Sequence, residues 1–319
     1  MDIPSPPAVP FAVGTFSTAG PAAGPPFPGL VKDGRVLDLS EHADTTRGLL
    51  ERWDDVLPLL READGDWRPL DGLAVHAPVD PRQILQSGAN YRTHVIDLAV
   101  AHEPEGGRPA ERVRAETAAM MDRRAAEDQP YMFIGLPSSV TGPYDDVVLP
   151  GWCAKPDWEL EVAAVIGRPA FRVPWERALE HVAAYTIAND LTAREAVFRR
   201  DMPEIGTDWL RAKNAPTFTP LGPYLVPAEF VDPGDLRVAL RLNGRTMQDE
   251  STKDMIFDVA RLVSYASQTV RLLPGDLVLT GSPAGNGLHW GRLLRPGDVM
   301  EGEVAGLGVQ RNRCVAEDA

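Results

Sequence analysis

The stretch that decides the fold is Asp157-Trp158-Glu159-Leu160-Glu161-Val162-Ala163-Ala164-Val165-Ile166-Gly167. It starts with acidic and apolar residues in alternation, which is typical of a β-strand. Successive side chains of a strand point to opposite faces, so Asp157, Glu159 and Glu161 share one face. Cα atoms two residues apart on a strand are separated by roughly 7 Å, so the two glutamates can converge on one cation.

Carboxylates this close repel each other unless a positive charge lies between them. A hard divalent ion such as Mg²⁺ or Mn²⁺ removes the repulsion and takes oxygen ligands. The alternative is a solvent-exposed face, which alternating charge on a strand commonly marks. A second predicted strand at 184–188 ends in Asn189-Asp190, and Asp190 would be a third oxygen ligand. This third carboxylate favours the metal site.

The surrounding sequence predicts an α+β protein that is mainly β. Short β-branched runs recur from residue 82 onward and are separated by Gly/Pro turns. These runs lie at 146–149, 159–166, 183–187, 224–226, 236–242, 276–280 and 298–304. Helical patterns are sparser and fall at 110–126 and 255–267. The order is not an alternating βαβ array, so we expect a catalytic domain over 81–319 built around sheets.

Residues 1–80 are expected to form a small α/β domain. The first thirty residues are rich in Pro, Ala and Gly, which predicts a loose arm or edge strands. Asp33-Gly34 lies between two apolar runs within 29–39 and predicts a hairpin. Apolar residues at helical spacing over 46–63 predict one amphipathic helix.

Composition limits the function classes. The chain has 319 residues and a formal net charge of -14, which argues against a nucleic-acid partner or an anionic membrane surface. No apolar run approaches the roughly 18 residues that a membrane span needs, and the first residues do not resemble a signal peptide. Two cysteines are too few for a disulfide framework. We therefore expect a soluble, cytoplasmic protein.

His94 is the candidate general base among six histidines. It precedes Asp97 by three residues, so on a helix the two side chains share a face. A carboxylate there can hold the imidazole tautomer and raise its basicity. The alternative is a helix-surface pair without a catalytic role. The other histidines show no partner pattern and are expected at the surface or in packing; they are His42, His76, His102, His181 and His289.

An ordered series of blocks between about residues 78 and 315 resembles the fumarylacetoacetate hydrolase family. One block alone would be weak evidence, whereas the ordered set is very specific. The blocks are Asn90-Tyr91-Arg92-Thr93-His94, 137–143, the 157–167 strand, 185–194, Lys213 before 217–223, 242–244 with Gln248, 255–257, 273–285 and 306–308.

The resemblance implies a fold, a metal and a set of roles. The fold would be a mixed β-sandwich roll with a lid segment at about 90–130, often in a homodimer. Mg²⁺ or Mn²⁺, with Ca²⁺ as a further possibility, would bind Glu159, Glu161 and Asp190. The remaining implied roles are water activation by His94 and Asp97, charge compensation by Lys213, and substrate contacts by Tyr91, Arg194, Thr280 and Ser282.

The implied activity is hydrolysis of a carbon–carbon bond in a 2,4-dioxo acid. His94 would take a proton from water, and hydroxide would attack the distal carbonyl while Lys213 offsets the oxyanion charge. A 2-oxo acid decarboxylase remains a close alternative, as does another lyase, an isomerase or a dehydratase, because all can share metal-stabilised enolate chemistry. A non-catalytic ligand-binding protein is a third possibility.

Departures from the family pattern bear on the substrate. Gly135 stands where many members have a lysine, and Asp97 stands where glutamate is common. Asn214-Ala215 replaces a stretch that often contains aspartate, and Ser282 replaces a threonine. The helix over 110–124 is expected to be a solvent-exposed surface helix. As a second hypothesis it extends the lid, with Met120 and Met121 facing a bulkier or more apolar substrate.

Overall fold

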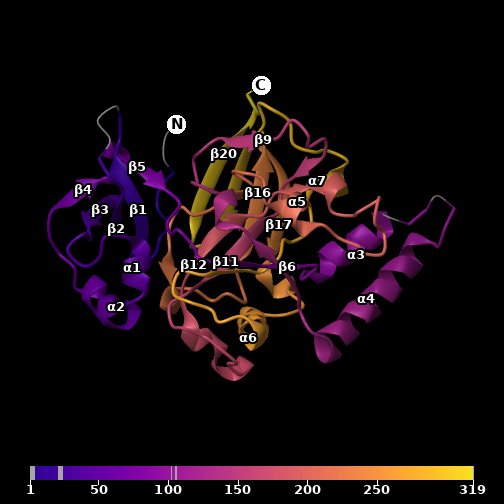
Figure 1. The fold of residues 1–319 in the computed structure, drawn as a ribbon, viewed down its shortest axis with the longest axis horizontal. Coiled ribbons are helices and arrows are strands. Elements are labelled where there is room, and N and C mark those ends of the chain that lie inside the picture. The colour runs from indigo at the N-terminus through magenta and orange to yellow at the C-terminus, as the bar shows by residue number, and fades with distance from the viewer. Residues whose placement is uncertain (1–3, 21–23, 102, 105, 319) are drawn as a thin grey trace.

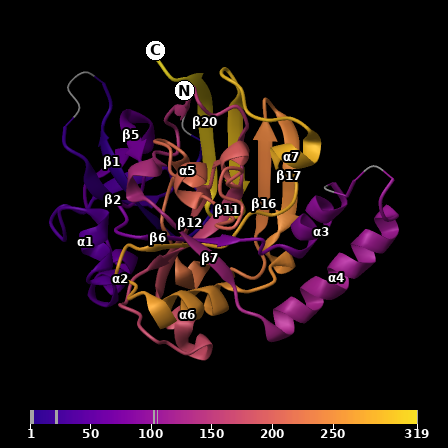
Figure 2. The same cartoon turned by 45° about the vertical axis from the view of Figure 1, so that its right-hand side comes forward.

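The computed structural model describes residues 4–20, 24–101, 103–104 and 106–318. Two large sheets form the centre of the molecule, and a third sheet from the N-terminal part of the chain lies beside them (Figure 1). Helices α3 (Arg92–Ala101) and α4 (Ala110–Glu127) lie at the opposite side from that N-terminal sheet in both views (Figure 2). The predicted class, α+β and mainly β, is confirmed.

The central sheet has six strands in the order β15-β12-β11-β18-β6-β7. Its members are β6 (Ile84–Gly88), β7 (Tyr131–Gly135), β11 (Leu160–Ile166), β12 (Val182–Asn189), β15 (Val226–Pro227) and β18 (Leu277–Leu279). β18 and β6 are parallel, and the other pairs are antiparallel. This sheet carries the residues on which the site depends.

Strand β11 is buried on both faces, which explains its apolar sequence. Leu160 and Val162 pack into one core cluster, whereas Ala163 and Val165 pack into another. The predicted strand at 157–166 is interrupted, because β10 (Pro156–Asp157) pairs elsewhere and β11 starts only at Leu160. At the interruption the amide of Glu159 donates to Asn189 Oδ1 over 3.0 Å, so a side chain replaces the ladder hydrogen bond.

The second large sheet packs against the first and has the order β17-β16-β19-β20-β9. Its strands are β9 (Val147–Leu149), β16 (Arg237–Leu242), β17 (Arg245–Ser251), β19 (Val299–Val304) and β20 (Gly308–Ala316). Two small pairs complete the strands: β10 with β13 (Thr192–Ala193), and β8 (Val140–Thr141) with β14 (Thr219–Pro220).

The N-terminal sheet has the order β4-β3-β2-β1-β5. It comprises β1 (Ala12–Thr18), β2 (Phe27–Lys32), β3 (Arg35–Asp38), β4 (Trp67–Pro69) and β5 (Leu73–His76). The predicted hairpin is confirmed, because Asp33 and Gly34 link β2 to β3 with positive φ angles of 49° and 72°. The expectation of a loose arm or edge strands is wrong for β1 and β2, which are interior strands with buried apolar residues.

The helix predicted over 46–63 is divided into α1 (Thr46–Leu50) and α2 (Trp53–Arg61). The break lets both segments direct their buried apolar side chains into one core cluster, which also contains Val13 and residues of the central sheet. Backbone hydrogen bonds between Val13 and Leu225, at 2.9 and 2.7 Å, join β1 to the segment before β15. The N-terminal sheet therefore shares its core with the central sheet.

Three further helices lie around the sheets. They are α5 (Trp209–Lys213), α6 (Val259–Thr269) and α7 (Gly287–Trp290). The helix predicted from Met255 begins later, because the Asp258 side chain caps it by accepting from the Arg261 amide at 2.8 Å. None of the described helices is both long enough and apolar enough to cross a membrane.

Asn90 joins three parts of the fold, which leads to a prediction about stability. Its buried amide group donates to the carbonyls of Phe257 and Thr280 at 3.0 and 2.8 Å and accepts from the amide of Phe257 at 2.9 Å. We expect Asn90→Ala to lower the free energy of unfolding by at least about 2 kcal/mol, because buried polar groups lose their partners. Urea denaturation followed by circular dichroism measures this change. A loss below about 0.5 kcal/mol would show that water replaces the amide.

Candidate active site and metal centre

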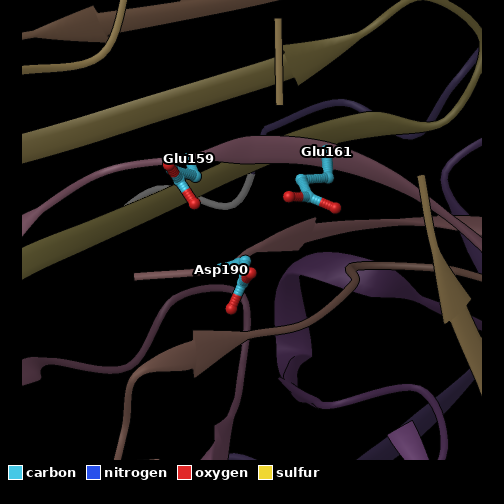
Figure 3. Close-up of side chains that lie close together, drawn as sticks. All are labelled: Glu159, Glu161 and Asp190. Carbon is cyan, nitrogen blue, oxygen red and sulfur yellow. The ribbon is translucent and has the colours of Figure 1, made fainter. Parts of the chain in front are cut away.

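Three carboxylates from neighbouring strands meet inside the central sheet (Figure 3). Glu159 lies just before β11, Glu161 lies on β11, and Asp190 follows β12 directly. One oxygen from each carboxylate lies within 4.8 Å of the others. Glu161 and Asp190 are each 1% exposed, so the predicted alternative of a solvated outer face is wrong.

Two cations, the buried Lys213 and the partly buried Arg194, hold this carboxylate cluster. Arg194 donates to Asp157 Oδ2 at 2.8 Å and to Glu159 Oε1 at 2.6 Å. Lys213 Nζ donates to Glu159 Oε2 at 2.5 Å, to Asp190 Oδ2 at 2.6 Å and to the Asp190 carbonyl at 2.8 Å. An ammonium group has three N–H donors, and all three bind protein oxygens here. Lys213 therefore supports the cluster. In this arrangement it has no donor left for a substrate oxyanion, which is the role that the family resemblance implies for it.

The charges around the cluster do not balance. Asp157, Glu159, Glu161 and Asp190 offer four negative charges, whereas Arg194 and Lys213 offer two positive charges, which leaves two negative charges over. Burial makes such an excess costly. A divalent cation fits both this charge and the all-oxygen donor set, so Glu159, Glu161 and Asp190 could hold Mg²⁺ or Mn²⁺.

The pKa values reflect the same excess. Burial, and next the charge of Asp190, raise the pKa of Glu161 well above its ordinary value. Burial also raises the pKa of Asp190 to about 6. Burial acts in the same direction on Glu159, but Arg194 and Lys213 outweigh it and lower the pKa of that carboxyl. Two of the three carboxyls thus resist ionisation, as expected for a site that is short of positive charge.

A tight turn after β18 orients Glu161. The amide of Gly281 donates to Glu161 Oε2 at 2.8 Å. Gly281 has a φ of 87°, and a Cβ there would lie 3.0 Å from the Cβ of Asn90 and 3.2 Å from the carbonyl oxygen of Ser87. Glycine at this position therefore lets the turn pass close enough to bind the carboxylate.

Gln86 and Gly135 together orient Asp190. Gln86 Nε2 donates to Asp190 Oδ1 at 2.5 Å, and the residue is buried. A Cβ at Gly135 would lie 2.9 Å from the Gln86 carboxamide, so the missing side chain at 135 makes the space that Gln86 fills. The expectation that Gly135 merely removes a cation was incomplete, because a neutral amide donor contacts the cluster from this side.

His94 lies on α3 and is 8% exposed. Burial lowers the pKa of its imidazole to about 4, so the ring is neutral near neutral pH and can accept a proton. The predicted hydrogen bond from His94 to Asp97 is wrong: none joins them in the described part of the chain. Instead, Asp97 accepts from Arg114 of α4 at 2.8 Å. A fixed guanidinium forms a stronger partner for the carboxylate than a neutral imidazole does.

One further histidine lies beside Asp97. His289 is exposed, so its predicted place at the surface is confirmed, and its Nδ1 lies 3.9 Å from Asp97 Oδ2. His289 lies on α7, which packs against α3, the helix that carries His94. The spacing of these residues in the sequence does not show this contact. His102 lies outside the described residues.

A cavity of about 540 Å³ opens beside the carboxylates. The predicted site residues that line it are His94, Glu159, Glu161, Arg194, Lys213 and Ser282. Two predicted substrate contacts are elsewhere: Tyr91 is fully buried, and Thr280 is buried with its hydroxyl donating to the Val162 carbonyl at 2.9 Å. These two residues support the walls of the site and do not line the cavity.

Helix α4 contributes none of its described residues to this cavity, although α3 contributes His94 and Leu98. Met121 is buried, Met120 is 44% exposed, and neither lines the cavity. The hypothesis that these methionines form the inner side of an extended lid is therefore wrong in this structure. Ion pairs such as Arg112–Glu116 at 2.7 Å lie on the exposed side of the helix, as expected for a surface helix.

Several residues of the site were not predicted from the sequence. Gln86 contacts Asp190, and Phe133 and Trp209 form an aromatic part of the wall. No local pattern marks them, because β7 and α5 meet only in the folded chain.

The chain is similar to known proteins over most of its length. A family model described as "Fumarylacetoacetate (FAA) hydrolase C-terminal" matches residues 83–315. The 2,4-didehydro-3-deoxy-L-rhamnonate hydrolase of Sphingomonas sp. is 37% identical over 268 residues, which cover 80% of this chain and 91% of that protein. The mitochondrial oxaloacetate tautomerase FAHD2A of Bos taurus is 39% identical over 293 residues, which cover 88% and 84%.

A solved structure extends the likeness to the fold. The fumarylacetoacetate hydrolase of Exiguobacterium antarcticum is 27% identical, with a TM-score of 0.73, over 96% of this chain and 100% of that one. The likeness therefore spans nearly the whole of this chain, including the N-terminal sheet.

The contact between Gly135 and Gln86 generates a prediction about metal affinity. We expect Gly135→Ala to displace the Gln86 amide from Asp190 and to weaken Mn²⁺ binding roughly tenfold or more, as is usual when a partner of a metal ligand is lost. Isothermal titration calorimetry measures the dissociation constant. Gly72→Ala is the matched control, because no atom lies within 4 Å of a Cβ at that position. Equal affinities for the two variants would mean that Gln86 does not orient Asp190.

Proposed function

The chain belongs to the fumarylacetoacetate hydrolase family, and we propose that it is a divalent-metal-dependent hydrolase that cleaves a carbon–carbon bond in a 2,4-dioxo acid. One observation carries the proposal: a neutral, buried His94 lines the same cavity as the carboxylates Glu159 and Glu161. A proton acceptor and a cation site therefore face one cavity. The Sphingomonas relative, named as the hydrolase of a 2,4-didehydro-3-deoxy acid, supports this class of substrate.

A bound Mg²⁺ or Mn²⁺, with Ca²⁺ as a further oxygen-binding candidate, would supply Lewis-acid stabilisation of the charge that develops on the 2-oxo oxygen. Glu159, Glu161 and Asp190 would hold it. Arg194 and Lys213 keep Glu159 ionised and oriented, because both bind its carboxylate. Both residues therefore prepare the ligands, and Arg194, which also lines the cavity, has further N–H donors that can bind the substrate.

The protein's own residues account for the proton movements. His94 accepts a proton from water, and the hydroxyl group adds to the C4 carbonyl carbon of the substrate. The C3–C4 bond then breaks, and its electron pair stays on C3, which takes the proton back from His94 to become the methyl group of pyruvate. C4 leaves as a carboxylic acid.

Oxaloacetate tautomerase is a second candidate, and one observation favours it. Asp97 is bound to Arg114, so His94 lacks the carboxylate partner that water activation commonly uses. Keto–enol exchange needs only a neutral base that moves a proton between carbon and oxygen. The bovine tautomerase relative supports this alternative.

An assay with several substrates separates these functions. We expect the purified protein with Mn²⁺ to release pyruvate and a carboxylic acid from acylpyruvates, and EDTA to stop the release. Proton NMR identifies the products directly. Keto–enol exchange of oxaloacetate without new products would assign a tautomerase, and release of carbon dioxide would assign a decarboxylase. Tight Mn²⁺ binding with no turnover of any of these substrates would indicate a non-catalytic binding protein and contradict the proposal.

Two variants separate the roles of the base and the cation site. We expect His94→Ala to reduce kcat by about a hundredfold or more while Mn²⁺ binding stays intact, because only a general base is lost. Glu161→Gln should instead abolish Mn²⁺ retention, measured by metal analysis after gel filtration. His42→Ala is the matched control, since His42 is exposed and distant in sequence from the site. An undiminished rate in His94→Ala would show that another group is the base.

A further inference from the structure

The cavity beside the carboxylate cluster extends well beyond the part that its polar residues line. Its volume of about 540 Å³ falls in the range of sites that bind drug-sized ligands. His94, Glu159, Glu161, Arg194 and Lys213 occupy one part of its lining. The remaining part of the lining must contact the substrate group that lies beyond the reacting carbons. The chemistry of this part therefore indicates the class of substrate.

Most of that remaining lining is apolar. The side chains come from five separate parts of the fold: α3, β7, the segment after β13, α5 and α7. They are Leu98, Phe133, Val197, Phe198, Trp209 and Leu288. Apolar surface of this kind gains free energy when it leaves water against an apolar ligand group. A small, fully polar acid would leave this apolar lining in contact with water.

Two of these side chains form a rigid aromatic surface. The rings of Phe133 and Trp209 are stacked, with centroids 4.4 Å apart and planes at 14°. Trp209 Nε1 donates to the Tyr131 hydroxyl at 2.5 Å, which fixes the indole and uses its polar atom outside the ligand space. The pair therefore presents apolar ring surface without an unsatisfied donor. Flat aromatic groups pack well on such a surface.

The aromatic pair lies next to the reacting centre. Lys213 Nζ lies 5.9 Å from the centroid of the Phe133 ring, and the same atom binds Glu159 and Asp190. In a 2,4-dioxo acid, the group attached to C4 is separated from the 2-oxo carbon by one methylene and one carbonyl. A substrate seated at the carboxylates thus places its C4 group within reach of these rings.

The charged residues at the cavity favour a second carboxylate on the substrate less strongly than the apolar lining favours an apolar group. Lys155 and Arg200 also line the cavity, but both are exposed to solvent, so a contact with them is screened by water. Glu195 lines the same region, and its carboxylate accepts from the backbone amides of Ala154 and Lys155. Its negative charge opposes a second anion there.

We propose that the substrate is an acylpyruvate whose acyl group is aromatic, and that Phe133 and Trp209 select it over small or dicarboxylic acylpyruvates. This inference rests on the function proposed above. It adds the chemical class of the C4 group, a flat ring that packs against the stacked pair. Trp209 and Phe133 are specificity-determining residues under this proposal and take no part in the proton transfers.

Turnover of three acylpyruvates tests the selection. We expect kcat/KM for benzoylpyruvate to exceed that for acetylpyruvate and for fumarylpyruvate at least tenfold, since burial of a ring contributes strongly to discrimination. Trp209→Ala should raise KM for benzoylpyruvate at least tenfold and leave KM for acetylpyruvate within about twofold. Trp175→Ala is the matched control, because Trp175 is 52% exposed and does not line the cavity. A preference for fumarylpyruvate that is lost in Lys155→Ala would overturn the inference and leave the hydrolase function intact.

Binding without turnover tests the inference separately. His94→Ala keeps the cavity lining around Phe133 and Trp209 and should bind benzoylpyruvate at least tenfold more tightly than acetylpyruvate in the presence of Mn²⁺, as measured by calorimetry. Leu288→Ala in the same background removes wall surface without touching α5, in case Trp209→Ala fails to fold. Equal affinity for the two ligands contradicts the aromatic site whether or not hydrolysis occurs. Selective binding together with an inactive wild-type enzyme supports the aromatic site and rejects the hydrolase.

Discussion

The structure depends on the compensation of buried negative charge at Glu159. Arg194 and Lys213 both bind this carboxylate, and they come from the segment that follows β12. Removing one partner of a buried ion pair typically costs about 3–5 kcal/mol, because the other charge remains without compensation. The two cations therefore tie the 192–213 segment to the central sheet. That segment also carries Val197, Phe198 and Trp209, so the same ion pairs that prepare the cation site position the apolar part of the cavity.

The central strands were predictable because their signal is local. The apolar run of β11 and the Asp33-Gly34 turn each carry their structure in consecutive residues. The three carboxylates were predictable as well, since neighbouring strands brought them to one place. In contrast, the Asp97–Arg114 pair and the Gln86–Asp190 contact join residues that are distant in sequence. Which partner a side chain takes is decided by packing in the folded chain, and no spacing rule records it.

The two halves of the proposed chemistry are held by forces of different strength. Glu161 lies on a strand buried on both faces, whereas His94 lies on a peripheral helix. Helix α3 is joined to α4 by Arg114–Asp97 and Arg92–Asp122, in which the arginines are about half exposed. Ion pairs of this kind contribute roughly 0–1 kcal/mol each and weaken with salt. The contacts between α3 and α4 are therefore weaker than those of the buried strand, and Thr93 at the start of α3 adds a second attachment through Asp254.

The contact between Gln86 and Gly135 has a consequence for how such a site evolves. The two residues lie on adjacent strands, β6 and β7, and the amide of one fills the space that the other leaves. A side chain gained at 135 before any change at 86 would collide with the amide, and a shortened residue at 86 alone would leave the Oδ1 atom of Asp190 without its donor. Each single step passes through an impaired intermediate. The pair is therefore epistatic: among descendants of this chain, positions 86 and 135 should change together or not at all.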